Sequence, residues 1–433
     1  MKIHADYKRF EAATDADAMR PHFEKALGHV GGAPVALEQF RVPRVFPRAD
    51  GGFTIQYRME MRKGNGCAGE TLILCGHLLS SSATRPGWAA DRRAFVVEGL
   101  DLIVPVFPFD PVLQSLAELR AQAGTPRILA SCYRKLAPGA AEPVVKGRRV
   151  LGYRMERRCV ELDTLGAAGS PKSDERNVIV RMLKPRKARA SSRTAAMLAA
   201  NGFGAGEAVT VPGLLEVDAE KGIQCMEFVR GEALHDLTGE TSFGVACDAA
   251  AQALRRLHAA PLRGLPDYPV EREIEQLRSW VLVGGKIFPE WSVCFEESYD
   301  AVASGPPGGD VAERVCIHRD FYDKQVLYSA DRVTLVDFDN AAAGDAAQDY
   351  GNFTAHLILR SEQESECAEN ILNGMKAFEQ SYGARDAAFA ARARWWQAAT
   401  LLRLAVLYAL RPRWRHLAPG LAEKTMASVN TQS

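Results

Sequence analysis

The sequence lacks the features of a membrane or secreted protein. None of its apolar runs reaches the roughly 20 residues that a membrane-spanning helix needs, and its first residues, Met-Lys-Ile-His-Ala-Asp-Tyr, contain no apolar signal-peptide core. Its nine cysteines stand singly, without a Cys-x-x-Cys pair or a Cys/His cluster, a pattern that argues against a disulfide framework and a zinc site. We therefore expect a soluble, cytoplasmic protein with reduced thiols and no membrane partner.

An excess of charge of either sign is also absent. The formal net charge is +1 and charged residues make up 25% of the chain, so nothing global indicates nucleic acid as a partner. The one basic cluster, Arg181–Arg193, is either a solvated helix start or a set of phosphate contacts. With 433 residues, 47% of them hydrophobic, the chain is long enough for two or three domains, and its oligomeric state stays open.

What the sequence does contain is a dense polar segment at residues 315–353. Three short β-rich runs lie within it: Val315–Ile317, Val326–Tyr328 and Val333–Val336. The last two predict a hairpin, and the three strand ends would present Asp320, Gln325 and Asp337. One carboxylate suits the acceptance of a hydroxyl proton, whereas an amide and a second carboxylate suit a Mg²⁺ ion on a nucleotide's phosphates.

The same segment carries an ordered set of motif residues: His318, Asp320, Gln325, Asp337, Asp339, Gly344, Asp345 and Asp349. This set resembles the His-x-Asp-x-x-x-x-Asn, Asp-Phe/Trp-Asp/Glu and Gly-Asp-Pro-x-x-Asp-Leu motifs of the aminoglycoside phosphotransferase and choline kinase superfamily, the small-molecule relatives of protein kinases. Gln325 stands where the superfamily usually has Asn. Its side chain is one methylene longer but supplies the same type of oxygen donor.

The resemblance implies a role for each of these residues. Asp320 would be the catalytic base, and His318, in the same catalytic loop, would support that loop by hydrogen bonds. Gln325 and Asp337 would be Mg²⁺ ligands, whereas Asp339 would either bind a second ion or order its loop. Further along the chain, the resemblance assigns Asp345 and Asp349 to tying the catalytic loop to the helical part of the fold.

The resemblance also implies a nucleotide site upstream of this segment. Arg181, on the expected strand Val178–Leu183, is our first choice for the cation that contacts the phosphates of ATP, and Lys184 is the second. The turn at residues 155–158 offers Arg157 and Arg158, as phosphate contacts or as a solvated hairpin tip.

Adenine would bind backbone groups of the hinge residues Glu227, Phe228 and Val229. Two departures from kinases stand out here. Arg181 stands where the family has a lysine, and the expected helix Ala190–Ala200 contains no acid to pair with the phosphate-binding cation. The turn at residues 155–158, where a kinase would place its glycine-rich loop, contains no Gly-x-Gly-x-x-Gly.

The implied fold class is α+β, a bilobal protein-kinase-like fold with an accessory N-terminal segment. We place the accessory segment at residues 1–125, the β-rich N-lobe at 126–232 and the helical C-lobe at 233–433. Alternation predicts a strand at Phe53–Met61. Strand-like runs predict further strands at Thr71–Leu78, Leu129–Tyr133 and Val209–Leu215. Pro105 and Pro108 argue against a central strand at Leu102–Phe109.

Two functions remain open from the sequence. The first is an ATP- and Mg²⁺-dependent kinase that phosphorylates a hydroxyl of a small molecule such as a sugar, an amino sugar or an aminoglycoside. The alternative is a nucleotide-binding pseudokinase with a regulatory role, which the Gln at position 325, the Arg at position 181 and the missing helix acid would suit. No residue at motif spacing marks the acceptor.

Overall fold

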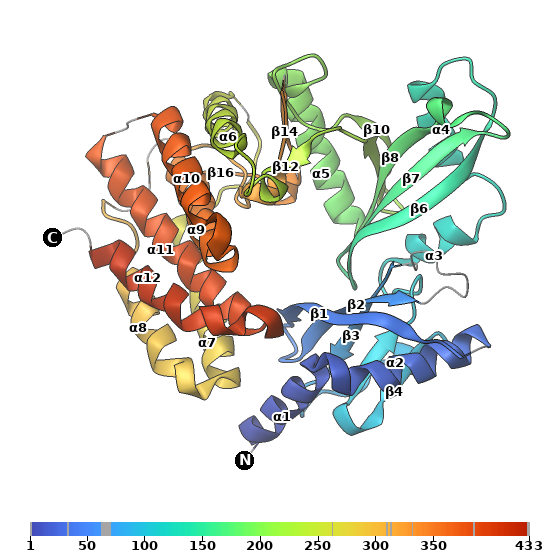
Figure 1. Ribbon diagram of the computed structural model, residues 1–433, viewed down its shortest axis with the longest axis horizontal. Helices are drawn as coiled ribbons and strands as arrows, with labels where there is room; N and C mark the ends of the chain where they lie inside the picture. The colour runs from blue at the N-terminus through green and yellow to red at the C-terminus, as the bar shows by residue number, and fades with distance from the viewer. Residues whose placement is uncertain are drawn as a thin grey trace. The chain divides into compact units, whose positions relative to one another are not determined.

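The computed structural model describes residues 2–32, 34–61, 71–261, 263–308, 311, 314–330, 332–383 and 386–430. The chain divides into two compact units (Figure 1). The first comprises residues 1–189, 214–228 and 410–413, and the second comprises residues 190–213, 229–409 and 414–433. No helix among the described residues combines the length and the apolarity of a membrane span.

The first unit begins with two helices and an antiparallel sheet of strand order β1-β2-β3-β5-β4. Their bounds are α1 (Lys2–Thr14), α2 (Ala16–Gly31), β1 (Leu37–Pro47), β2 (Phe53–Met61), β3 (Thr71–Leu78), β4 (Ala94–Val97) and β5 (Leu102–Pro105). The predicted bounds of β2 and β3 are confirmed. Phe23 of α2 packs its ring against Tyr57 at 4.5 Å and Phe40 at 5.0 Å between centroids, so the helix covers one face of this sheet.

Two expectations for this region are wrong. The segment with Pro105 forms β5, an interior strand, because the strand ends at Pro105 and the missing N–H therefore removes no bond from its middle. The run Leu129–Tyr133 lies in a helix, α4, rather than in a strand. Its buried residues Leu129, Ala130, Cys132 and Tyr133 are spaced as one face of a helix.

A second five-stranded antiparallel sheet follows, in the order β10-β11-β8-β7-β6. The remaining elements of the first unit are α3 (Gln114–Ala121), α4 (Arg127–Leu136), β6 (Pro143–Arg154), β7 (Arg158–Ala167), β8 (Arg176–Leu183), β10 (Leu214–Asp218) and β11 (Ile223–Glu227), while α5 (Pro185–Leu198) begins in this unit. Val178, Val180 and Met182 of β8 share one core with α3, α4 and the β3 residues Ile73 and Cys75. The N-terminal segment is therefore packed into the same core as the second sheet.

The second unit is mainly helical (Figure 1). Its helices are α6 (Phe243–Ala259), α7 (Val270–Ile287), α8 (Ser292–Val302), α9 (Ala346–Gln363), α10 (Ala368–Tyr382), α11 (Ala387–Ala409) and α12 (Ala418–Asn430). Its strands are β9 (Val209–Thr210), β12 (Glu232–Ala233), β13 (Val315–Ile317), β14 (Val326–Ser329), β15 (Arg332–Leu335) and β16 (Ala342–Gly344). The strand expected at Val209–Leu215 is split, because Pro212 and Gly213 separate β9 from β10.

Two buried carboxylates in the first unit each lie beside a partly buried arginine. Glu161 and Asp163 of β7 are fully buried; Arg120 of α3 lies 2.8 Å from Glu161, and Arg148 of β6 lies 3.3 Å from Asp163. Burial raises the pKa of Asp163 from 3.8 to about 6, with the attraction of Arg148 opposing the rise and the repulsion of Glu161 adding to it. Between these two pKa values, Asp163 therefore keeps its proton in the folded state but has released it in the unfolded chain.

We expect this carboxyl group to make stability fall as pH rises through 6. Its contribution is fully present below the unfolded-state pKa of 3.8 and is lost as pH rises through the folded-state value of about 6. Between pH 4 and pH 7.5, urea denaturation should show the free energy of unfolding of the wild type falling by about 2 kcal/mol relative to Asp163→Asn. The exposed Asp174→Asn serves as the control, and an equal pH dependence of wild type and Asp163→Asn would contradict the prediction.

Candidate active site

The catalytic loop that follows β13 is held by one buried carboxylate. Asp349, in the first turn of α9, accepts hydrogen bonds from the backbone N–H groups of His318 at 2.6 Å and Arg319 at 2.7 Å, one through each carboxylate oxygen. His258 of α6 contacts the same carboxylate at 3.1 Å and the hydroxyl of Tyr382 at 2.8 Å. Asp349 thus joins the loop that carries Asp320 to three helices, α6, α9 and α10.

Asp345, expected to make the same kind of connection, has a different set of partners. It caps α9 by accepting a hydrogen bond from Ala347 N at 3.0 Å, and it accepts others from Arg392 Nε at 3.0 Å and Trp396 Nε1 at 3.3 Å. These bonds fix the start of α9 against α11. The catalytic loop is therefore tied through Asp349, four residues further along the same helix.

Gln325 and Asp337 leave the same end of the β14–β15 hairpin. Val326 pairs with Leu335 in the antiparallel register, and Val336 N donates to the carbonyl of Gln325 at 3.0 Å. The buried Gln325 directly precedes this paired end and Asp337 directly follows it. The sheet order β12-β14-β15-β9 gives both hairpin strands an outer neighbour, so the two residues start from a rigid base.

A hydrogen bond connects the catalytic loop to this hairpin end. His318 is fully buried, and its Nε2 lies 2.9 Å from the carbonyl oxygen of Val336, the residue before Asp337. Its ring also packs against Phe338 at 4.5 Å. His318 therefore lies between the loop of Asp320 and the loop of Asp337, where it sets their spacing.

Two residues of these loops have left-handed backbone conformations. Arg319 and Asp337 both have φ of 66°, a conformation that costs a residue with a side chain roughly 1 kcal/mol and is found most often at functional sites. The hydrogen bonds that the backbone N–H groups of His318 and Arg319 donate to Asp349 help to hold Arg319 in place. The guanidinium group of Arg319 also lies 3.4 Å from the ring centroid of Tyr268. These contacts thus hold Arg319 in a backbone conformation that glycine would adopt without strain.

Sequence reasoning missed an ion pair next to Gln325, at the end of the hairpin from which Gln325 and Asp337 leave. Asp323, fully buried in the 3-10 helix Asp323–Gln325, accepts hydrogen bonds from Arg360 Nε at 2.9 Å and lies 3.4 Å from His235. Burial alone would raise the pKa of Asp323, but the bond to His235 and the charge of Arg360 outweigh it and lower the pKa. Asp323 therefore stays ionised and anchors Gln325 two residues away.

Asp339 has a partner on α5. Ser191 Oγ donates to Asp339 Oδ1 at 2.9 Å. This bond orders the 3-10 helix Phe338–Asn340 that contains Asp339, and one oxygen of the carboxylate is already engaged in it. The arrangement favours the loop-ordering role over that of a second metal ligand.

Arg181 is oriented by a residue that the sequence did not single out. The side chain of Arg181 is buried on β8, and its Nη1 donates to Gln224 Oε1 at 3.3 Å from the directly opposite position on β11. Gln224 Nε2 in turn donates to the carbonyl of Ala188 in α5 at 3.0 Å. An amide thus connects the cation to the helix, where kinases use a helix acid. Only the strand register, which the sequence does not give, identifies Gln224.

The other expected phosphate-contacting residues lie at one end of the second sheet. Arg158 pairs with both Arg154 and Leu183 across neighbouring strands, so the turn that contains Arg157 lies near Lys184, the residue after Leu183. Burial and the neighbouring guanidinium groups of Arg157 and Arg158 lower the pKa of Arg154 to about 10. This end of the sheet is therefore a site of concentrated positive charge.

The hinge residues lie where the two compact units meet in the sequence. β11 ends at Glu227, the partly exposed Phe228 is the last residue of that stretch of the first unit, and Val229 begins the next stretch of the second. This position suits a hinge.

The oxygen donors at the hairpin end fit a nucleotide-bound Mg²⁺ ion. Within the described residues, no three or more His, Cys, Asp or Glu side chains are grouped as metal ligands. Mg²⁺ on a nucleotide does not need such a group, because one or two protein oxygens complete a shell made mostly of phosphates and water. The amide oxygen of Gln325 and the carboxylate of Asp337 supply that number.

Comparison with known proteins identifies a family for this chain. The model of the phosphotransferase enzyme family, APH, matches residues 172–388, just over half of the chain. A candidate aminoglycoside phosphotransferase from Ralstonia eutropha JMP134 has a TM-score of 0.50 at 15% identity, over 71% of this chain and 99% of its own. The choline kinase LicA of Streptococcus pneumoniae has a TM-score of 0.43 at 14% identity, over 70% and 98%.

A comparison with curated proteins finds no match. The likeness to the Ralstonia structure confirms the expected α+β, protein-kinase-like fold, and the family match confirms the resemblance drawn from the motif residues. The chain belongs to the phosphotransferase enzyme family.

Proposed function

We propose that this protein transfers the γ-phosphoryl group of ATP, with Mg²⁺, to a hydroxyl of a small molecule such as a sugar, an amino sugar or an aminoglycoside. The observation that carries the proposal is the bond of His318 to Val336, which fixes the loop of Asp320 beside the strand end that delivers Gln325 and Asp337. A general base and two metal-ligating oxygens are thereby held on one rigid support.

Asp320 is the proposed base. Its carboxylate accepts the proton of the acceptor hydroxyl and orients that oxygen for in-line attack on the phosphoryl group. The bonds of Asp349 to the two residues before Asp320 fix the backbone from which this side chain extends. The positioning role of Asp349 follows directly, because a shift of the loop would move the base away from the acceptor.

Gln325 and Asp337 are the proposed metal ligands. When bound, Mg²⁺ bridges the phosphates and neutralises the charge that develops during transfer. The ion pair of Asp323 with Arg360 fixes the backbone two residues before Gln325. The side chain of Gln325, which is longer than that of the usual Asn, therefore extends from a fixed backbone. Gln325 thus supplies the same kind of metal ligand, an amide oxygen, as the Asn that the family usually has at this position.

The nucleotide contacts are proposed for the first unit. Arg181 neutralises phosphate charge, with Lys184, Arg157 and Arg158 as further contacts, and the backbone of residues 227–229 binds adenine. The bond from Arg181 to Gln224 supplies the orientation that a helix acid would give. This support for the cation favours an active kinase over the pseudokinase alternative. We also propose the division into residues 1–125, 126–232 and 233–433 as the functional domains.

Removing either proposed carboxylate should abolish turnover. Asp320→Asn leaves no base and Asp337→Asn removes the metal ligand's charge, so each should lower kcat at least 1,000-fold in an assay of ADP release across a panel of sugars, aminoglycosides and choline. The exposed Asp300→Asn on α8 is the matched control and should retain full activity. EDTA should stop the wild-type reaction and excess Mg²⁺ should restore it.

The pseudokinase alternative gives a different result in the same assay. Wild-type protein would then bind ATP, measured by calorimetry, while no acceptor in the panel is phosphorylated and Asp320→Asn changes nothing. That outcome would overturn the proposed kinase activity.

Gln224 offers a test of how the phosphate cation is held. Gln224→Leu removes the acceptor for Arg181, so the KM for ATP should rise about tenfold while the KM for the acceptor stays within twofold. Gln224→Glu keeps an oxygen acceptor for Arg181, so its KM for ATP should rise less than that of Gln224→Leu. The exposed Gln122→Leu in the same unit is the control, and an unchanged KM for ATP in Gln224→Leu would contradict the proposed orientation of Arg181 by Gln224.

A further inference from the structure

The turn between β6 and β7 has an unusual backbone for the residue that it contains. Glu156 has φ of 62°, in the left-handed region that glycine or asparagine normally fills in tight turns. The turn is closed by a hydrogen bond from Arg157 N to Arg154 O at 3.0 Å. A glutamate at this position keeps its conformation only if contacts outside the turn compensate for the strain.

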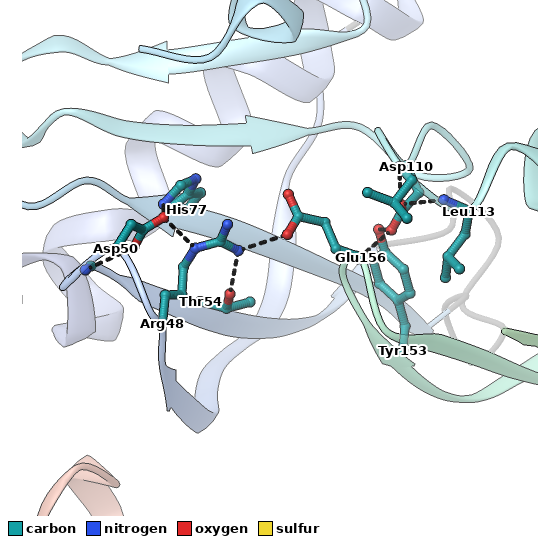
Figure 2. A network of polar contacts seen from close by, with 10 residues as sticks. Arg48, Asp50, Thr54, His77, Asp110, Leu113, Tyr153 and Glu156 are labelled. Carbon is teal, nitrogen blue, oxygen red and sulfur yellow. Dashed lines mark hydrogen bonds and ion pairs between the residues drawn. The ribbon is translucent and has the colours of Figure 1, made fainter. Parts of the chain in front are cut away.

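The first of these contacts comes from the N-terminal sheet. Arg48, in the loop after β1, forms an ion pair with Glu156 at 3.0 Å, and both side chains are only 20% exposed. Arg48 is itself fixed by Asp50 at 3.1 Å and by Thr54 Oγ1 at 3.3 Å (Figure 2). His77 of β3 lies 3.2 Å from the same Asp50, so the pair is embedded in a polar network.

The second contact comes from the segment that joins the N-terminal sheet to α3. Asp110, almost completely buried, accepts hydrogen bonds from the backbone N–H of Glu156 at 2.9 Å and from the hydroxyl of Tyr153 at 2.8 Å. Its other oxygen accepts from the N–H groups of Val112 and Leu113. Figure 2 shows Asp110 and Arg48 on either side of Glu156.

Further bonds fix the strand that leads into the turn. Gln56 of β2 donates to the carbonyl of Tyr153 at 2.5 Å, and the thiol of Cys75 on β3 lies 3.7 Å from the same oxygen. The N-terminal sheet therefore holds the end of β6 through its backbone as well as through side chains.

The turn held in this way presents the positive charge described above. Arg154 lies with its guanidinium 3.9 Å from the ring centroid of Phe46 on β1, and Arg157 and Arg158 follow Glu156 directly. Arg44 of β1 adds its repulsion to that of Arg157 and Arg158 on Arg154. Neighbouring guanidinium groups repel one another, and the oxygens of a phosphate chain, which guanidinium groups bind in pairs, would offset that repulsion.

We propose that residues 37–61 and 71–112 are a positioning element for the β6–β7 turn: Arg48 and Asp110 hold Glu156 so that Arg157 and Arg158 are presented to the phosphates of the nucleotide. The proposal rests on the nucleotide site of the proposed function and gives the N-terminal segment a role in it. Arg48 and Asp110 act through Glu156 and touch no substrate.

The first test uses trypsin, because the turn contains its cleavage sites after Arg157 and Arg158. In native protein, Arg48→Met should free the turn and speed cleavage there about fivefold, as followed by mass spectrometry of the fragments. Arg85→Met is the matched control, since Arg85 lies in the same segment but pairs with Glu98 and Asp101. Equal cleavage rates in wild type and Arg48→Met would overturn the proposal.

The second test measures Mg·ATP binding by calorimetry. Arg48→Met should weaken binding about fivefold, and Glu156→Gln, which keeps the backbone bond to Asp110, should have the same effect. Because the two residues act through one contact, the double variant should be no weaker than either single variant. Additive losses would show that Arg48 acts by another route and would overturn the proposal. If Arg48→Met does not fold, Glu156→Gln tests the contact alone.

The outcomes separate this inference from the proposed function. If wild type binds Mg·ATP and Asp337→Asn weakens binding while Arg48→Met does not, the positioning role is wrong and the kinase site stands. If wild type binds no nucleotide, both proposals fail at the nucleotide site, even where faster cleavage shows that Arg48 holds the turn.

Discussion

The arrangement of the candidate site depends on one carboxylate that accepts two successive backbone amides. Asp349 is fully buried, and a buried charge is tolerated only where hydrogen bonds replace its water. The N–H groups of His318 and Arg319 supply that replacement. Their alignment toward one side chain requires a sharp bend in the chain, which agrees with the left-handed conformation of Arg319. The position of Asp320 is a consequence of this bend.

Much of this could be predicted from the sequence, for identifiable reasons. The motif residues lie within a short segment, so their spacing alone indicates a loop and a hairpin, and the hairpin has the predicted strands within one residue at each end. Alternation of apolar and polar residues identified β2, and a short apolar run bounded by turn residues identified β3. These features are local, and local pattern is what a sequence displays directly.

The remaining features depend on contacts between distant parts of the chain. Gln224 is recognisable as the partner of Arg181 only once β8 and β11 are paired, and Arg360 as the partner of Asp323 only once α9 is packed. The helix α4 was mistaken for a strand because its apolar residues begin as a short continuous run, Ile128 to Ala130, and such a run does not distinguish a strand from a helix. In β5 the proline rule gave the wrong result, since Pro105 closes the strand instead of interrupting it.

The strand β9 has a consequence for the order in which the protein folds. It runs parallel to β15 and completes the catalytic hairpin's sheet, with the hydroxyl groups of Thr210 and Thr334 2.9 Å apart across 124 positions of sequence. The hairpin itself closes over a few residues, whereas this outer strand must wait for a long loop to close at an entropic cost. On the ribosome, the residues of β9 emerge well before their partner strand exists, so the end of the hairpin that carries Gln325 and Asp337 acquires its final rigidity only late in synthesis.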